Sequence, residues 1–587
     1  MFRSSRRQII LASFIIPLLA VGGWIYARRP QPVVIASYVP ESALGYLEIN
    51  NWPQLLDSFT STNAWRQLAP VYGVSNKLDY IGKVSQWDLM AQITGGGEAA
   101  MLARAQFAIV VTGLEVRGEE VKPRLALIAE THSNPESLGE VMERRLPELA
   151  RNIFGQFVKA TDRYNGVQVT AYRAENSDKQ LVAAQIEGEL ILANHPDPLR
   201  ACIDTRLGRA PSMAGNFYLQ NARPIVERAD CADGGGCMFG FVTGEGVTRL
   251  LRFGTFLISG DVLSKAALAG AMGDVFTEFS TRATDGIAYG ANFENGVVVD
   301  RYALMLKPEV ADALKTAIKP NAKALRATDV IPAEAADVTL VGVENPMKTL
   351  DGIEAAISAR IGAAQSFLLH QFVIGAREAF LGLRANDKAE EAIGDEIANF
   401  NTTMESEDRV WLVAPRDRAF VTTLVERVFT AQGAVLAREK YEGVEIVSSS
   451  DGRRGAAAFV GDFLAIGKRE RLVSLIDSHQ RGQSIKSAPR FVAASRVSPP
   501  AAVRSFTSVK NESGEMMAVI ARWIVTESAT APGGSPPAPA NVAALNQLPF
   551  AASATSVNDR GIYVEARSPF GNFPFFVSIF AGATNGK

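Results

Sequence analysis

The chain has 587 residues, of which 47% are hydrophobic and 21% charged, and its formal net charge is -2 at pH 7. This balance is typical of folded globular proteins, and the length predicts about two to four domains because a single core rarely grows so large. No basic excess is present to neutralise phosphates, so the composition argues against nucleic-acid binding.

The first segment of the chain has the pattern of a membrane anchor. Residues 9–27 are almost wholly apolar and uncharged, and arginines flank both ends. At about 1.5 Å per residue this length spans a bilayer core of about 30 Å. We therefore predict a cytoplasmic tail at 1–8, a transmembrane helix at 9–27 and a linker at 28–38, with the bulk of the chain in the periplasm or outside the cell. The alternative is a signal peptide cleaved after the small residues at 20–22, which also exports the chain.

Strands and helices then alternate through the first half. The predicted elements are a strand at 44–49, a helix at 53–59, a mostly helical stretch at 63–105, a hairpin at 107–129, a helix at 134–151 and a hairpin at 287–305. Asn295-Gly296 between alternating runs is a strong hairpin signal, since both turn residues accept positive φ. Because the strands are short and joined by turns, we expect a mainly antiparallel sheet with helices packed on one face.

Three cysteines occur in the chain, all in the first half. In an oxidising compartment, Cys231 and Cys237 can form a disulfide that bridges the glycine-rich loop between them. Cys202 then stays unpaired. The alternative is three unpaired thiols. A zinc site is not expected, because no CxxC spacing is present and the nearest histidine is His195.

One stretch of the first half is repeated in the second. Tyr-Asn-Gly-Val at 164–167 recurs as Tyr-Glu-Gly-Val at 441–444, and each copy ends in Ile-Asp, at 203–204 and 476–477. The predicted elements around the two copies also follow the same order, which indicates a duplicated unit. We predict two α+β lobes at 39–325 and 326–587, which superpose Tyr164 on Tyr441, Gly166 on Gly443 and Asp204 on Asp477.

The shared residues have structural explanations. Each glycine precedes a strand, where it permits a turn conformation that is costly for other residues. Each tyrosine is expected to cap the core with its hydroxyl reaching solvent. Each aspartate closes a helix, an unfavourable place beside the helix dipole, so it should bond a neighbouring loop or an arginine.

The second lobe carries additional segments. Residues 352–400 form an apolar helical insertion, and the Pro- and Gly-rich residues 531–540 form a solvated loop. We expect the inserted helices to pack on the strand layer of their own lobe; a partner protein or the membrane surface is the alternative.

Each catalytic motif that we considered lacks at least one required residue. No Gly-x-Ser-x-Gly pentapeptide occurs, and the phosphate-loop pattern at 342–349 has Met347 where its second glycine should be. The Gly-x-Gly at 244–246 is interpreted as a tight turn. The four histidines, His132, His195, His370 and His479, are far apart in sequence, so no helix face carries two metal ligands. We predict no catalytic, cofactor-binding or metal-binding residues; a carboxylate pair drawn from both copies is the remaining alternative.

Four segments carry a family resemblance: residues 39–53, 105–114, 123–132 and 164–167. In these segments, and more loosely in the second half, the chain resembles an uncharacterised family of bacterial membrane-anchored proteins catalogued as a domain of unknown function. The resemblance implies a tether and exported domains, and it implies no reaction.

Together these patterns predict a non-enzymatic envelope protein that is anchored to the cytoplasmic membrane and binds an unknown protein or small-molecule partner. The alternative is a hydrolase-like enzyme whose site lies between the lobes. A deep cavity there, lined by His132, Asp204 or other clustered titratable groups, would favour the enzyme.

Overall fold

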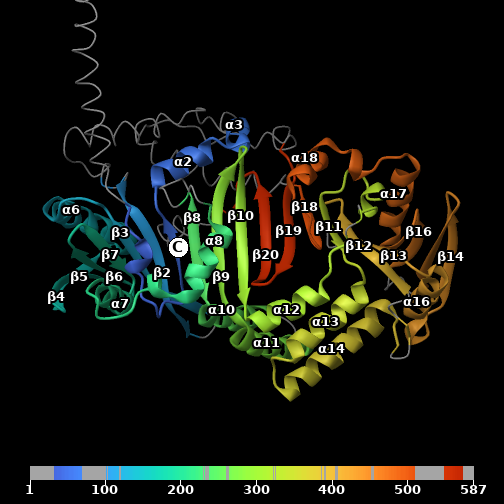
Figure 1. Cartoon of the computed structure of the whole chain (residues 1–587), viewed down its shortest axis with the longest axis horizontal. Helices are drawn as coiled ribbons and strands as arrows, with labels where there is room; N and C mark the ends of the chain where they lie inside the picture. Colours follow the sequence, from blue (N-terminus) through green and yellow to red (C-terminus); the bar gives the residue numbers. More distant parts are fainter. Residues whose placement is uncertain are drawn as a thin grey trace, which may run out of the picture.

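Figure 1 shows an elongated α+β molecule in which one large antiparallel sheet runs along the longest axis. This computed structural model describes residues 32–68, 101, 104–117, 120–228, 231, 237–259, 263–321, 323, 325–384, 387–388, 392–403, 408–450, 455–508 and 548–572. Within these residues, no helix is long and apolar enough to cross a membrane. The predicted anchor at 9–27 and the predicted loop at 531–540 lie outside the described residues.

The strands are β1 Gly45–Ile49, β2 Gln106–Arg117, β3 Glu120–Glu130, β4 Phe157–Tyr164, β5 Val167–Ala174, β6 Gln180–Ile186, β7 Glu189–Ala193, β8 Met238–Thr243, β9 Thr284–Glu294, β10 Val297–Leu306, β11 Asp337–Gly342, β12 Ile393–Asn401, β13 Val410–Pro415, β14 Leu436–Tyr441, β15 Val444–Ser449, β16 Ala456–Val460, β17 Phe463–Gly467, β18 Val503–Thr507, β19 Ala551–Asn558 and β20 Gly561–Ser568.

The α-helices are α2 Trp52–Thr60, α3 Asn63–Leu68, α6 Pro135–Phe154, α7 Pro196–Arg206, α8 Phe217–Val226, α10 Gly244–Ser259, α11 Leu263–Ala283, α12 Pro308–Ala317, α13 Pro346–Ser358, α14 Ala363–Leu381, α16 Arg418–Thr430, α17 Arg469–Gln480 and α18 Pro489–Val497. Short 3-10 helices are η1 Ile35–Ser37, η3 Met213–Gly215, η4 Ala327–Asp329, η5 Ala431–Gly433 and η6 Ile485–Ser487.

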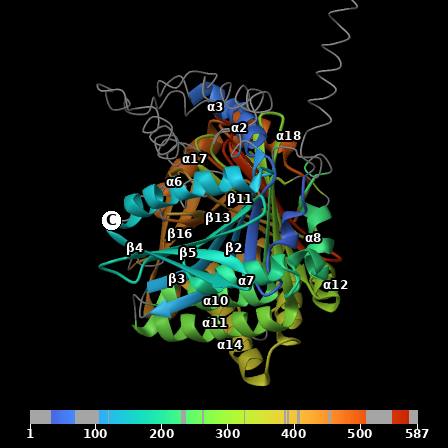
Figure 2. The same ribbon diagram turned by 90° about the vertical axis from the view of Figure 1, so that its left-hand side faces the viewer.

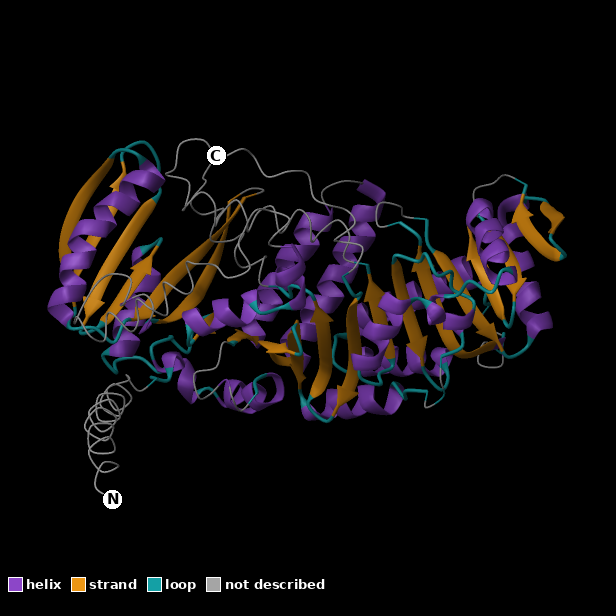
Figure 3. Ribbon diagram, turned by 90° about the horizontal axis from the view of Figure 1, so that it is seen from above, coloured by secondary structure: helices purple, strands orange, loops and turns teal. Residues whose placement is uncertain are grey.

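The sheet is continuous through both halves of the chain. The first ten strands lie in the order β4-β5-β6-β7-β3-β2-β1-β8-β9-β10. The last ten lie in the order β14-β15-β16-β17-β13-β12-β11-β18-β19-β20. The two series meet where β10 pairs antiparallel with β20. The predicted α+β class and antiparallel pairing are thus confirmed, but one sheet replaces the expected separate sheets (Figure 3).

Helices cover both faces of the sheet, so the prediction of helices on one face is wrong. Strand β7 shows the reason: Ile191 packs with Leu199 of α7, whereas its neighbour Leu192 packs with Leu146 of α6. Successive strand residues point to opposite faces. Because residues 190–193 of β7 are all apolar, this strand needs cover on both sides. In the second half, α17 and α16 cover the two faces in the same way.

The inserted helices of the second half pack mainly on helices of the first half. Leu369 and Val373 of α14 contact Val275 of α11, and Ala356 of α13 belongs to one cluster with Leu314 of α12. The expectation that they would cover the strands of their own lobe is therefore wrong for α14 and right in part for α13, whose Met347 packs with Leu464 of that strand layer. The predicted insertion at 352–400 is also too long, because strand β12 begins at Ile393.

The repeated hairpin has the same geometry in both halves. The turn residues have positive φ in each: 51° and 87° at Asn165 and Gly166, and 46° and 82° at Glu442 and Gly443. Two adjacent residues with φ > 0 make a type I′ turn, which matches the twist of hairpin strands. Both glycines therefore lie in equivalent turns directly before a strand, as the repeat predicted.

Each tyrosine of the repeat donates a hydrogen bond to the aspartate of its own copy, whereas we predicted a hydroxyl that reaches solvent. The Tyr164 hydroxyl donates to Asp204 at 2.8 Å, and the Tyr441 hydroxyl donates to Asp477 at 3.0 Å. In the first half, Asn165 also donates to Asp204, at 2.6 Å. Each aspartate therefore ties the end of its helix to the hairpin, as a loop-bonding role requires.

The Gly-x-Gly at 244–246 begins α10 and is not the tight turn that we predicted. A Cβ on Gly246 would lie 2.1 Å from the carbonyl oxygen of Leu44, and one on Gly244 would lie 2.5 Å from that of Thr284. Glycine is required here because the helix start lies directly against β1 and β9.

Candidate functional site

A cavity of about 810 Å³ lies beside α16 in the second half. We call it the α16 cavity. Its volume is within the range of about 300–1,000 Å³ that small-molecule sites occupy. Its lining consists of Glu378, Leu381, Gly382, Arg384, Ile393, Val413, Val421, Leu424, Val425, Arg427, Val428, Phe429, Thr430, Ala431, Leu464 and Ile466.

The interior of the α16 cavity is apolar because α16 is amphipathic. The helix begins at Arg418, where the side chain of Asp417 accepts a hydrogen bond from the Phe420 amide at 3.0 Å. Val421, Leu424 and Val425 share the helix face that is turned to the sheet and are buried. The opposite wall comes from the same face of β13 and β17, at Val413, Leu464 and Ile466.

Charged groups surround this apolar interior. Arg427 pairs with Asp387 at 2.5 Å, and the backbone N–H of Arg384 donates to the same carboxylate at 2.8 Å. Glu378 lies on the last turn of α14, which ends at Gly382 with a left-handed φ of 66°. The arrangement can enclose the apolar body of a ligand and leave a polar end among charged side chains.

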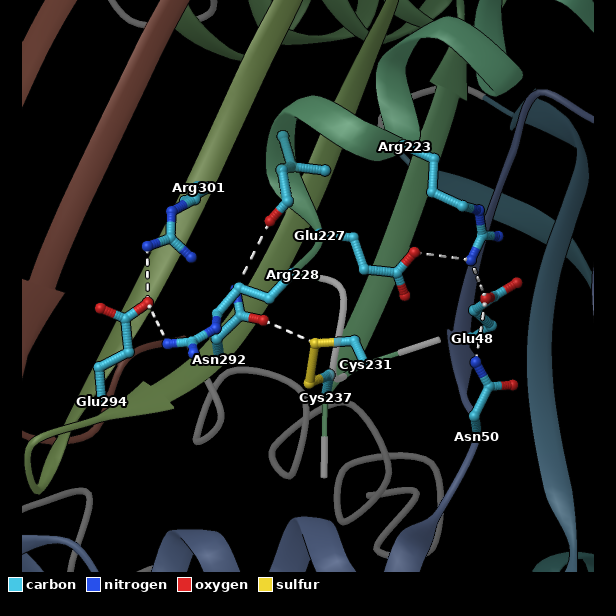
Figure 4. Close-up of a disulfide and its surroundings, with 11 residues drawn as sticks. Glu48, Asn50, Arg223, Glu227, Arg228, Cys231, Cys237, Asn292, Glu294 and Arg301 are labelled. Carbon is cyan, nitrogen blue, oxygen red and sulfur yellow. Dashed lines mark hydrogen bonds and ion pairs between the residues drawn. A yellow bond between two sulfur atoms is a disulfide. The ribbon is translucent and has the colours of Figure 1, made fainter. Parts of the chain in front are cut away.

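A partly buried ionic network lies at the centre of the sheet, and Figure 4 shows its part around Glu294. Arg301 on β10 pairs with Glu294 at 2.6 Å and with Glu565 on β20 at 3.1 Å. Arg567 pairs with Glu565 at 2.8 Å and Arg228 with Glu294 at 3.2 Å. Burial raises the pKa of Glu294, but the guanidinium groups around it outweigh burial and hold the pKa below its usual value. This network ties the two halves together.

A second network in the same view surrounds Arg223 of α8. Its guanidinium donates to Glu48 at 2.6 Å, to Glu227 at 3.1 Å and to the Tyr46 hydroxyl at 3.0 Å. It also stacks over the Phe239 ring, 3.9 Å from the centroid. Burial raises the pKa of Glu227, whose charge Arg223 compensates. The guanidinium thus has three hydrogen-bond partners, whereas, among the described residues, the second carboxylate oxygen of Glu48 is buried without one.

A disulfide joins Cys231 and Cys237, the pair that the sequence proposed, with their Cα atoms 5.6 Å apart. The bridge lies between the two ionic networks, and the Cys231 sulfur is 2.8 Å from the Asn292 side chain (Figure 4). Cys202 is a free, buried thiol, and burial raises its pKa far above the usual range. A neutral, enclosed thiol is inert.

Two carboxylates that the sequence did not single out face each other across β3 and β7. Glu130 lies opposite Glu189, which is 1% exposed. Arg206 donates to Glu189 at 2.9 Å, and the Tyr38 hydroxyl lies 3.5 Å from Glu130. Burial raises the pKa of Glu189 to about 7, against the opposing effect of Arg206. These two glutamates are far apart in sequence, so only the strand register could have revealed the pair.

The histidines contact different groups. His132 has a positive φ of 52° and lies 3.1 Å from Gln106, and burial lowers its pKa. His195 caps α7, and His370 pairs with Glu354. Within the described ranges, no three potential metal ligands gather in one place.

Comparison with known families finds one match. The family described as "Protein of unknown function (DUF3352)" matches residues 385–578. The match supports an uncharacterised domain family, but it lies in the second half, whereas the resemblance expected from the sequence rested mainly on the first. No curated protein and no solved structure matches the chain.

Proposed function

We propose that this chain is an exported, membrane-tethered binding protein without enzymatic activity, held by a helix at 9–27 with its bulk outside the cytoplasmic membrane. The apolar N-terminal segment supports the tether. The disulfide between Cys231 and Cys237 supports export, because disulfides persist in oxidising compartments.

We also propose that residues 39–325 and 326–587 are two copies of one unit. The matching strand orders support this, and so does the register across the central strands. In the first half, across β1, β8, β9 and β10, Tyr46 pairs with Phe241, Phe241 with Ala288, and Ala288 with Ala303. In the second half, across β11, β18, β19 and β20, Val338 pairs with Phe506, Phe506 with Ala552, and Ala552 with Arg567. The two series match residue for residue. On this correspondence Arg301 is the counterpart of Glu565, and the two lie opposite each other. An approximate two-fold axis would then pass between them.

The α16 cavity carries the functional part of the proposal: it binds the apolar body of a small molecule. Its apolar wall residues include Leu424, Phe429 and Leu464, and they line a half-open space of about 810 Å³. A concave, mostly apolar space of this size with a few polar groups at its edge is the usual form of a small-molecule site.

Photolabelling tests this function on the full chain in detergent. A long-chain alkyl diazirine should label peptides of α16 and β17. Leu424→Trp should reduce that labelling by about tenfold, because the indole fills the space that the alkyl chain would occupy. The matched control is Thr423→Trp, an exposed position on the same helix. Equal labelling in the two variants, with unchanged thermal stability, would refute the cavity as a binding site.

The hydrolase alternative gains no specific support from the residues that were its best candidates. Asp204 is bonded to Tyr164 and Asn165, and His132 to Gln106. Their partners give these side chains structural roles. Binding is therefore the function that we propose.

A further inference from the structure

A pair of buried carboxylates lies near one end of the sheet, in the first half of the chain. This end, with α7 on one face and α6 on the other, faces the viewer in Figure 2. Glu130 on β3 and Glu189 on β7 lie opposite each other and are 8% and 1% exposed. Among the described residues, the Oε1 oxygen of Glu189 is buried without a hydrogen-bond partner. Buried polar atoms are nearly always paired, so this oxygen indicates that a further group binds here.

The second half of the chain shows that the fold does not need this pair. On the proposed correspondence of the two copies, the strand register puts Ala414 and Phe463 at the places of Glu130 and Glu189. Both are 1% exposed and belong to the apolar core of the second half. Replacing buried charged groups by apolar residues is often neutral or stabilising. The carboxylates therefore have a role other than holding the sheet together.

One guanidinium serves the carboxylates of this cluster. Arg206 of α7 donates to Glu189 at 2.9 Å and to Glu187 at 2.8 Å, while Glu130 lies on the neighbouring strand. Burial raises the pKa of Glu189 to about 7 against the effect of Arg206, and the charge of Glu130 adds to the rise. Glu189 can thus hold a proton where exposed glutamates are ionised. The titratable and charged groups around the pair are Tyr38, Arg104, His132, Glu187, Cys202 and Arg206.

The same cluster holds residues 33–38, the last part of the predicted linker, which we call the linker end. The Tyr38 hydroxyl lies 3.5 Å from the Glu130 carboxylate, and the Arg206 guanidinium lies over the Tyr38 ring, 5.0 Å from its centroid. In the second half Val330 takes the place of Tyr38, since each of the two directly follows a short 3-10 helix. The polar attachment therefore belongs to the half that the predicted anchor precedes.

The first residue of the linker end is bound beside the pair. The Val33 N–H donates to the Gln106 side chain at 2.8 Å, and that side chain donates to the Val33 carbonyl oxygen at 2.9 Å. Gln106 lies opposite Glu130 in the sheet, and its oxygen is 3.1 Å from Nε2 of His132. Burial lowers the pKa of His132, which favours the neutral ring in this contact. Titratable groups thus lie at both ends of the linker end.

We propose that Glu130 and Glu189 form a proton-binding site that controls how firmly the linker end and α7 are held on the sheet. With one proton on the pair, a single negative charge faces Arg206. Release of that proton puts two like charges together in a buried place, which favours a local opening that admits water. The consequence for the tether rests on the proposed anchor at 9–27, whereas the proton site does not.

The direction of the pH effect follows from Glu189. Its pKa is raised in the closed form, so the closed form holds the proton more tightly than the open form. The contribution of Glu189 to docking is therefore fully present below about pH 4.5 and is lost as pH rises to about 7. His132 acts in the opposite sense, because its lowered pKa makes protonation favour the open form.

Hydrogen exchange of the full chain in detergent, read by mass spectrometry of its peptides, tests the proposal. The exchange rate of residues 33–39 in the wild-type chain is divided by the rate in Glu189→Gln at the same pH, which removes the intrinsic pH dependence and the effect of His132. This ratio should rise by about tenfold from about pH 5 to about pH 7.5, because glutamine stays neutral. Residues 325–331, the counterpart in the second half, should show no such rise. A ratio that does not change with pH, or an equal rise in both segments, would overturn the proposal.

Two further variants separate the pair from its surroundings. Glu130→Ala combined with Glu189→Phe gives the first half the apolar pair of the second half, and it should reproduce the behaviour of Glu189→Gln. Glu187→Gln is the matched control, because this exposed side chain bonds the same Arg206 and should leave the wild-type pH dependence in place. Wild-type pH dependence in the double variant, or its loss in the control, would contradict a proton site at the pair.

Discussion

Glu189 shows why an individual side chain can escape sequence reasoning. Neither it nor Glu130 belongs to a catalytic motif, and they meet only because β3 and β7 pair in a particular register. A one-residue slip would move every side chain of the strand to the other face. By contrast, Gly166 and Gly443 could be found from the sequence, because the repeat preserves a local turn whose geometry depends on neighbouring residues alone.

The buried carboxyl of Glu189 should make stability depend on pH. Its pKa rises from 4.5 to about 7 on folding, so the folded chain holds the proton more tightly than the unfolded chain. The contribution of this carboxyl to the free energy of unfolding is therefore fully present below about pH 4.5. It falls as pH rises to about 7, by at most about 3 kcal/mol. Glu189→Gln should flatten this part of a plot of melting temperature against pH. Glu187→Gln, an exposed neighbour, should leave the slope unchanged; identical slopes in both variants would contradict the assignment.

At the scale of elements, the order of strands and helices was largely predictable and their packing was not. Alternating runs and Asn-Gly turns are local signals, so the hairpin of β9 and β10 could be placed from the sequence. The partners of α13 and α14 could not, because an apolar helix face carries no information about which surface will cover it. The α16 cavity could not be predicted from the sequence for the same reason, because its lining residues come from separate segments of the second half.

The repeated turns should respond alike to the same substitution. Replacing Gly166 or Gly443 by valine forces a β-branched residue into positive φ, which should cost about 1–3 kcal/mol in each half. Urea unfolding, followed by limited proteolysis to identify the weakened half, measures the effect. The control is Gly215→Val, where φ is not positive and the added side chain meets open space. A loss in one half only would argue against equivalent hairpins.

For the whole molecule, export and anchoring remain predictions, because the N-terminal segment lies outside the described residues. A reporter enzyme that works only outside the cytoplasm should be active when fused after Lys587. The mature N-terminus should be Met1 or Phe2, as read by mass spectrometry of the membrane fraction. A soluble form that starts near Gly23 would replace the anchor by a cleaved signal peptide. An inactive reporter, with the chain present, would contradict export altogether.

The join between β10 and β20 has a consequence for how such a molecule could have arisen. In a dimer of identical chains, a residue on the two-fold axis meets its own copy, so a charged residue there meets a like charge. On the two-fold correspondence that we propose, the axial position holds Arg301 opposite Glu565, an ion pair 3.1 Å long. Two identical chains cannot place opposite charges at that point, whereas one polypeptide that encodes both halves can. Once the pair had formed, the halves would no longer be interchangeable, and separating them into two identical subunits would bury two unpaired charges of one sign.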